Sequence, residues 1–133
     1  MYKRWKLRKD ENGQSLVEFA LVVPVLLLFL LGIVEFGWLF NAKISLTSAA
    51  REGARVAAVS NINHQAKAEE AVKSALSGTS GVDVISVGYE SEIDTLNNIR
   101  NVIIEVNGQV DPIIGFFVSG PQSMKAKATM RLE

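Results

Sequence analysis

An apolar run near the N-terminus constrains this chain more than any other feature of its sequence. From Leu16 to Phe40 only Glu18 and Glu35 are charged, and the stretch from Phe19 to Val34 is an unbroken apolar run. As a helix, the longer segment would extend roughly 37 Å at about 1.5 Å per residue, whereas the hydrocarbon core of a bilayer is about 30 Å thick. The run therefore predicts a transmembrane helix, which we assign to residues 14–40.

The charges on either side of this run predict its orientation. Residues 1–13 hold five bases against two acids, whereas the rest of the chain holds nine bases against twelve acids. Bases gathered on one side of a membrane segment favour the cytoplasmic side. We therefore expect a single-pass protein of the cytoplasmic (inner) membrane in contact with lipid, with residues 1–13 as a cytoplasmic leader and residues 41–133 as an extracytoplasmic domain. Because the basic patch is confined to the leader, we expect no direct nucleic-acid partner.

An ordinary cleaved secretory signal is the first alternative to a transmembrane helix. Such a signal has an apolar region of about 7–15 residues, followed closely by a site of small residues. Here the apolar run is longer, and the nearest small-residue site, Ser48-Ala49-Ala50, lies well beyond Phe40. Ordinary signal cleavage is therefore disfavoured.

The two carboxylates of the apolar segment have different surroundings. For Glu35, at its far end, we favour a carboxylate that snorkels or pairs at the interface over a functional contact. Glu18 lies soon after Gly13, and a cut after Gly13 would place a free ammonium on Gln14, one helical turn before Glu18. These opposite charges would attract more strongly in apolar surroundings than in water. The alternative is a carboxylate at the level of the lipid headgroups that pairs with nothing.

The segment from Asn41 to about Ser60 is expected to continue the same helix into water. Small residues recur there at a spacing of four, among them Ala49, Gly53 and Ala57. Such a row lets another backbone approach closely. We favour packing against the protein's own sheet, with a partner helix as the alternative.

The remaining sequence predicts a small α+β domain. Asn63 can cap a second helix over about His64 to Leu76, whose apolar positions follow helical spacing. Three segments with strand character follow, namely Val82–Tyr89, Ile99–Val110 and Ser123–Leu132. The last alternates between apolar and polar residues, as in an antiparallel sheet covered on one face. The predicted fold class is α+β, with a long N-terminal transmembrane helix continuing into a second helix and a roughly three-stranded antiparallel sheet.

Two local features of this region leave a choice of structure. Asn107-Gly108 could be a hairpin turn, but we favour a kink or bulge within one strand because too few residues follow before Pro112 for a return strand. The apolar segment 112–121 should not face bulk water. We favour its folding under as core, and contact with the membrane surface or with a neighbouring subunit is the alternative.

The sequence offers no pattern of residues that predicts catalysis. It has no cysteine and a single histidine, His64, which we expect on the surface at the start of a helix. There is no glycine-rich phosphate loop, no nucleophile motif and no spacing typical of metal ligands. We therefore expect no catalytic residue, no metal and no cofactor, and we expect that the protein is not an enzyme.

Several separated motifs carry a resemblance to a known family. They are Gly13-Gln14-Ser15-Leu16-Val17-Glu18-Phe19-Ala20, Pro24, Gly32-Ile33-Val34-Glu35-Phe36-Gly37, Ala49-Ala50-Arg51-Glu52-Gly53-Ala54-Arg55 and the final Ala128-Thr129-Met130-Arg131-Leu132-Glu133. The first is similar to the processing site of type IV prepilins. Together they resemble the TadE-like pseudopilins of the tight-adherence (Tad/Flp) pilus assembly system.

The resemblance implies a role in pilus assembly. A prepilin peptidase would cut after Gly13, Gln14 would become the new N-terminus, and Glu18 and Phe19 would serve peptidase recognition and assembly. The implied partners are that peptidase, other pilin or pseudopilin subunits and the Tad membrane assembly platform. The protein would then be a minor pilin or pseudopilin that reaches an extracellular pilus and supports adherence and biofilm formation. The alternative is an uncleaved single-pass anchor that carries a small extracytoplasmic binding module.

Overall fold

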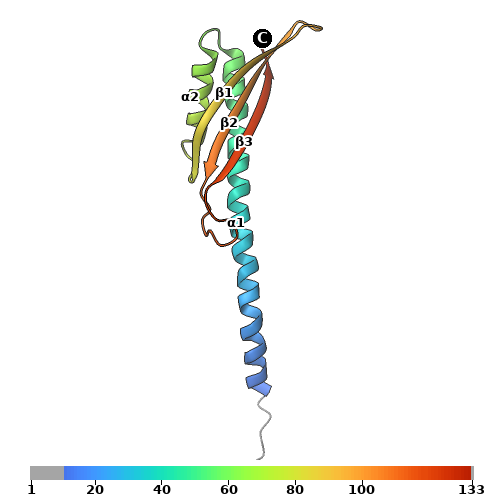
Figure 1. Ribbon diagram of the computed structural model, residues 1–133, viewed down its shortest axis with the longest axis vertical. Helices are drawn as coiled ribbons and strands as arrows, with labels where there is room; N and C mark the ends of the chain where they lie inside the picture. Colours follow the sequence, from blue (N-terminus) through green and yellow to red (C-terminus); the bar gives the residue numbers. More distant parts are fainter. Residues whose placement is uncertain (1–10, 133) are drawn as a thin grey trace, which may run out of the picture. The chain divides into compact units, whose positions relative to one another are not determined.

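The computed structural model describes residues 11–132, so most of the leader predicted at 1–13 and the last residue of the C-terminal motif lie outside the described residues. Helix α1 extends from Glu11 to Val59 and continues through Pro24 (Figure 1). It is long and apolar enough to cross a membrane, by length and composition. The chain divides into two compact units between Val34 and Glu35, inside the segment that we assigned to the membrane.

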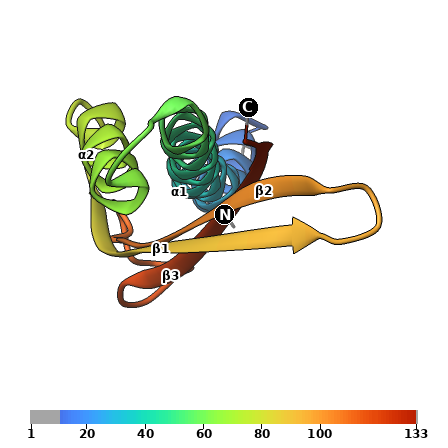
Figure 2. The same cartoon turned by 90° about the horizontal axis from the view of Figure 1, so that it is seen from above.

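The C-terminal unit combines two helices with one sheet. After the last part of α1 come α2 (His64–Leu76), β1 (Val82–Asp94), β2 (Ile99–Val110) and β3 (Gln122–Arg131). The strands form an antiparallel sheet in the order β1-β2-β3. Figure 2 shows α2 and the C-terminal part of α1 on the same face of this sheet. The predicted α+β class, with a second helix and three antiparallel strands, is confirmed.

The core of this unit lies between the helices and the covered face of the sheet. Helix α1 contributes mostly alanines, and larger aliphatic side chains come from the other elements. Small side chains on α1 let its backbone lie close to its neighbours, and Val and Ile at alternate positions of β2 fill the space that remains. The core residues are Leu46, Ala49, Ala50, Ala54, Ala57, Ala68, Val72, Leu76, Val102, Ile104, Val106 and Ala126.

Strand β1 is longer than the predicted segment that ended at Tyr89. It continues to Asp94 because β2 offers a full antiparallel partner, with Glu90 opposite Ile103 and Asp94 opposite Ile99. The turn that follows is held by the Asp94 carboxylate, which accepts hydrogen bonds from the Leu96 amide (3.0 Å) and the Asn97 side chain (2.8 Å). The hydrogen bonds from Asn97 and Leu96 keep the pKa of Asp94 below its ordinary value.

Asn107-Gly108 lies within one strand, as we favoured, and not in a hairpin turn. The bulge at this level is in β1, because Val84 pairs with Gly108 whereas Ser86 pairs with Asn107, which leaves Ile85 as the extra residue. Gly108 serves packing instead, since a Cβ atom there would lie 2.8 Å from Leu46 Cδ2. The glycine therefore allows α1 to approach β2.

The start of α2 differs from the prediction in its chemistry. Asn63 is at the N-cap position, but its backbone is left-handed (φ 54°) and its side chain makes no capping hydrogen bond. Asparagine tolerates this conformation better than most residues, which accounts for its presence. His64 is half-buried, whereas we expected a surface residue: its Nδ1 donates to the Ala57 carbonyl (2.8 Å) and its ring stacks on Tyr89.

Candidate functional site

The predicted processing residues lie at the start of α1. Gly13, Gln14, Glu18 and Phe19 are all exposed, and α1 already includes Gly13. The Gln14 side-chain amide donates a hydrogen bond to Glu18 Oε1 at 3.3 Å, as the spacing of one helical turn allows. The carboxylate of Glu18 is thus within reach of polar groups on residue 14.

The row of small residues on α1 is occupied by the chain's own domain. Ala49 and Ala57 are buried in the core, and Gly53 between them is also buried. A Cβ atom on Gly53 would lie 2.7 Å from Val72 Cγ2 and 3.3 Å from the Ala68 carbonyl oxygen. This face of α1 is therefore filled by α2 and the sheet.

Glu35 makes a contact that the sequence analysis did not predict. Its side chain is 0% exposed, so it does not snorkel to solvent. Oε1 accepts a hydrogen bond from the Gly115 amide (2.8 Å), and Oε2 accepts one from the Phe117 amide (3.2 Å). Within residues 11–132, neither of the salt bridges that are present involves Glu35. Both carboxyl oxygens accept hydrogen bonds from backbone amides, and these bonds offset the free-energy cost of burying the group.

Residues 112–121, which we call the apolar loop, do not fold under as core, so that expectation was wrong. The exposed fractions are 56% for Ile113, 66% for Phe116 and 45% for Phe117, and Ile114 is also exposed. Gly115 has φ of +69°, a conformation that turns the loop amides toward Glu35 and that other residues rarely adopt. The amides of Gly115 and Phe117 therefore point toward the buried Glu35, while the large side chains of the loop are exposed.

Two further hydrogen bonds from α1 lie near this loop. Trp38 Nε1 donates to the carbonyl of Asp111 (3.0 Å), the residue just before the loop, and Lys43 Nζ donates to the carbonyl of Lys125 on β3. Phe36, Leu39 and Phe40 border a shallow groove of about 400 Å³ beside these lysines. Two features of the sequence could have indicated the contact of Glu35 with this loop: Glu35 at the end of an apolar run, and Gly115 inside the apolar loop.

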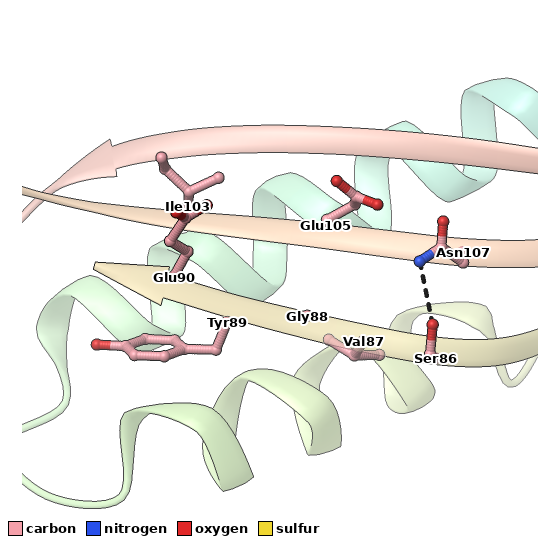
Figure 3. Close-up of a pocket in the computed structure, with 8 residues that line it drawn as sticks. All are labelled: Ser86, Val87, Gly88, Tyr89, Glu90, Ile103, Glu105 and Asn107. Atoms are coloured by element: carbon pink, nitrogen blue, oxygen red, sulfur yellow. Dashed lines mark hydrogen bonds between the residues drawn. The ribbon is translucent and has the colours of Figure 1, made fainter. Parts of the chain in front are cut away.

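The sheet carries a hollow of about 410 Å³ (Figure 3). It is formed by neighbouring segments of β1 and β2, and Asn107 Nδ2 donates to Ser86 Oγ (3.0 Å) there. The acids that border it are Glu90 and Glu105, and no histidine, lysine or arginine is among its lining residues. Among the residues that the structure describes, no group of three or more His, Asp or Glu side chains could hold a metal ion. The hollow offers hydrogen bonding and no assembled nucleophile.

The long apolar helix and the α+β unit together indicate the class of protein. The chain is a small α+β domain that continues from one helix able to span a membrane, as in a membrane-anchored protein. Within this class, the family model of TadE-like protein matches residues 13–55. The match begins at Gly13 and ends at Arg55, within the row of small residues, so residues 13–55 are similar to the TadE-like family, in agreement with the resemblance seen in the sequence. No curated protein and no solved structure matches the chain.

Proposed function

We propose that the protein is a minor pilin or pseudopilin of a Tad-type pilus, that a prepilin peptidase cuts it after Gly13, and that it supports adherence and biofilm formation. It would act as a substrate and structural subunit, not as an enzyme. The membrane helix holds the subunit in the cytoplasmic membrane, with its N-terminus in the cytoplasm and its α+β unit outside, until the assembly platform extracts it. The observation that carries the proposal is the TadE-like match over residues 13–55, which starts at the proposed cut site.

The geometry of residues 14–18 supports a role for Glu18 after the cut. The side chain of Gln14 already reaches Glu18 Oε1, and the new ammonium would be on the same residue. Such a charge pair, within one subunit or between neighbours, would remove two isolated charges from the apolar surroundings of a helix bundle. Pairing there is stronger than in water because less solvent screens the charges.

The N-terminus of the mature protein tests the proposal directly. We expect intact-mass spectrometry of the membrane-purified protein to give a chain that begins at Gln14. Replacement of Gly13 by leucine should abolish this product, because a bulky side chain beside the scissile bond would not fit a site that accepts glycine. Gly37→Leu is the matched control, since Gly37 is on the same helix with no atom within 4 Å of an added Cβ. A full-length chain in the unmodified protein would support the uncleaved anchor instead.

Glu18 gives a second expected result. Glu18→Ala should leave the protein in the carbonate-washed membrane fraction, because removing a charge does not weaken an apolar helix. Its amount in sheared pili should fall at least about tenfold, equivalent to losing about 1.4 kcal/mol of subunit affinity. Glu52→Ala is the control, because Glu52 is an acid on the same helix that forms an ion pair with Arg55 (2.6 Å). Unchanged incorporation of the Glu18 variant would exclude the pairing mechanism.

A further inference from the structure

The apolar loop combines two properties that seldom occur together on a water-exposed surface. Its large side chains, Ile113, Ile114, Phe116 and Phe117, are exposed next to one another in the sequence. Two of its amides, by contrast, are satisfied by a fully buried carboxyl group. Irregular backbone can enter an apolar phase only where its polar groups are bonded within the protein. The hydrogen bonds to Glu35 meet this requirement for two amides at the centre of the loop.

Chain connectivity determines where these amides lie relative to a membrane. Glu35 directly follows Val34, the last residue of the unbroken apolar run. From Leu16 to Val34 a helix extends roughly 28 Å, close to the ~30 Å hydrocarbon thickness. If this run spans the bilayer, the Glu35 carboxyl group lies at its outer boundary, and the loop amides bonded to it lie at the same level.

The residues that follow Glu35 on α1 have the composition of a membrane interface. Trp38 donates a hydrogen bond to the carbonyl of Asp111, the residue just before the loop, and tryptophan is enriched at membrane interfaces. Phe36 and Phe40 are 49% and 68% exposed, so they extend the apolar surface. Lys43 comes next and donates to the Lys125 carbonyl, while the side chain of Lys125 is 73% exposed and its Nζ lies 3.8 Å from Glu105 Oε1. Within the C-terminal unit, exposed apolar side chains thus follow Glu35 along α1, and basic residues come after them.

We propose that the apolar loop is a second membrane contact, with Ile113, Phe116 and Phe117 inserted into the interfacial layer of the bilayer beside the end of the transmembrane segment. The inference rests on the membrane insertion in the proposed function, and it adds a site to it. Two contacts, one helix and one loop, would hold the α+β unit against the membrane and prevent its rotation about the helix axis. Extraction of the subunit would then have to release both.

Because the sequence contains no cysteine, one introduced cysteine gives a single site for a spin label. Full-length protein with Phe116→Cys is spin-labelled and reconstituted into phosphatidylethanolamine and phosphatidylglycerol vesicles. Collision of the label with oxygen, which partitions into lipid, is compared with collision with a water-soluble nickel chelate. Ile113→Cys is a second probe of the loop, and Leu96→Cys is the control, because Leu96 is 94% exposed at the β1–β2 turn. Leu26→Cys, within the apolar run, reports the membrane span itself.

We expect the oxygen-to-nickel collision ratio to be several-fold higher at residues 113 and 116 than at residue 96, and highest at residue 26. A high collision ratio at residue 26, together with ratios at residues 113 and 116 equal to that at residue 96, would contradict the second membrane contact. The proposed function would be unaffected by this result. A loop label shielded from both oxygen and nickel would show burial against another subunit, and would also overturn the proposal. A low ratio at residue 26 would contradict the membrane span on which both depend.

Discussion

Gly53→Leu is expected to destabilise the α+β unit by about 3 kcal/mol, because the space beside Gly53 is already filled. An added Cβ would lie 2.7 Å from Val72 Cγ2 and 3.3 Å from the Ala68 carbonyl oxygen, so even the first new atom forces α1 and α2 apart. Overpacking of a close-packed core typically costs about 1–3 kcal/mol, and leucine adds three carbons beyond Cβ. For a unit of this size the melting temperature should fall by roughly 15 °C.

The measurement is thermal unfolding of the full-length protein in detergent, followed by the fluorescence of Trp38 in a Trp5→Phe background. Gly37→Leu is the matched control, because it makes the same change on α1 where an added Cβ meets nothing within 4 Å. Both variants gain about the same helix propensity, so the difference between them isolates the packing term. Equal melting temperatures for the two variants would contradict the close approach of α1 and α2.

Glu35→Ala is expected to release the apolar loop while the sheet stays folded. The change removes both acceptors of the Gly115 and Phe117 amides, and hydrogen bonds to a charged group contribute roughly 1.5–3 kcal/mol each. With about 3 kcal/mol less to hold the loop, the exchange rate of these amides should rise about a hundredfold, since 1.4 kcal/mol corresponds to a factor of ten. In Glu35→Gln, which retains one carboxamide oxygen as an acceptor, the exchange rates of these amides should lie between those of the unmodified protein and those of Glu35→Ala.

Hydrogen–deuterium exchange of the full-length protein in detergent checks this expectation. Amides of β2 should keep the protection they have in the unmodified protein, because no core side chain is altered. Glu52→Ala is the control for removing an acid from α1, since Glu52 accepts its hydrogen bonds from Arg55, far from the loop in the sequence. Unchanged exchange at Gly115 and Phe117 in the Glu35→Ala variant would show that the carboxyl group does not hold the loop.

The helices and strands could be predicted from the sequence because each one depends on a pattern of residues within its own segment. The apolar spacing from His64 to Leu76 predicted α2 with its observed bounds, and alternation predicted β2 and β3 to within one or two residues. Strand β1 was predicted too short because its second half contains Glu90 and Glu92, which weaken a local strand signal. Pairing with β2 supplies the hydrogen bonds that this half needs, and such pairing is not visible in a single segment.

The candidate functional residues also include some that the sequence predicted and some that it did not. The motif around Gly13 and Glu18 is contiguous, so it was found in the sequence and coincides with the start of the family match. The contact of Glu35 with Gly115 and Phe117 joins positions about eighty residues apart, as the separations of 80 and 82 show. Spacing along one chain carries no information about such a contact. The apolar loop was therefore expected in the core, where its composition alone would place it.

The sequence by itself determined a helix able to span a membrane, its charge asymmetry and the α+β class, because hydrophobic period and charge act over a few residues. Only the tertiary structure decided which partners fill the small-residue face of α1, and that Glu35 is buried among loop amides. Those outcomes depend on volume and hydrogen-bond donors that distant segments bring together. The apolar run therefore ends at a carboxyl group that holds the loop we propose to lie in the membrane interface.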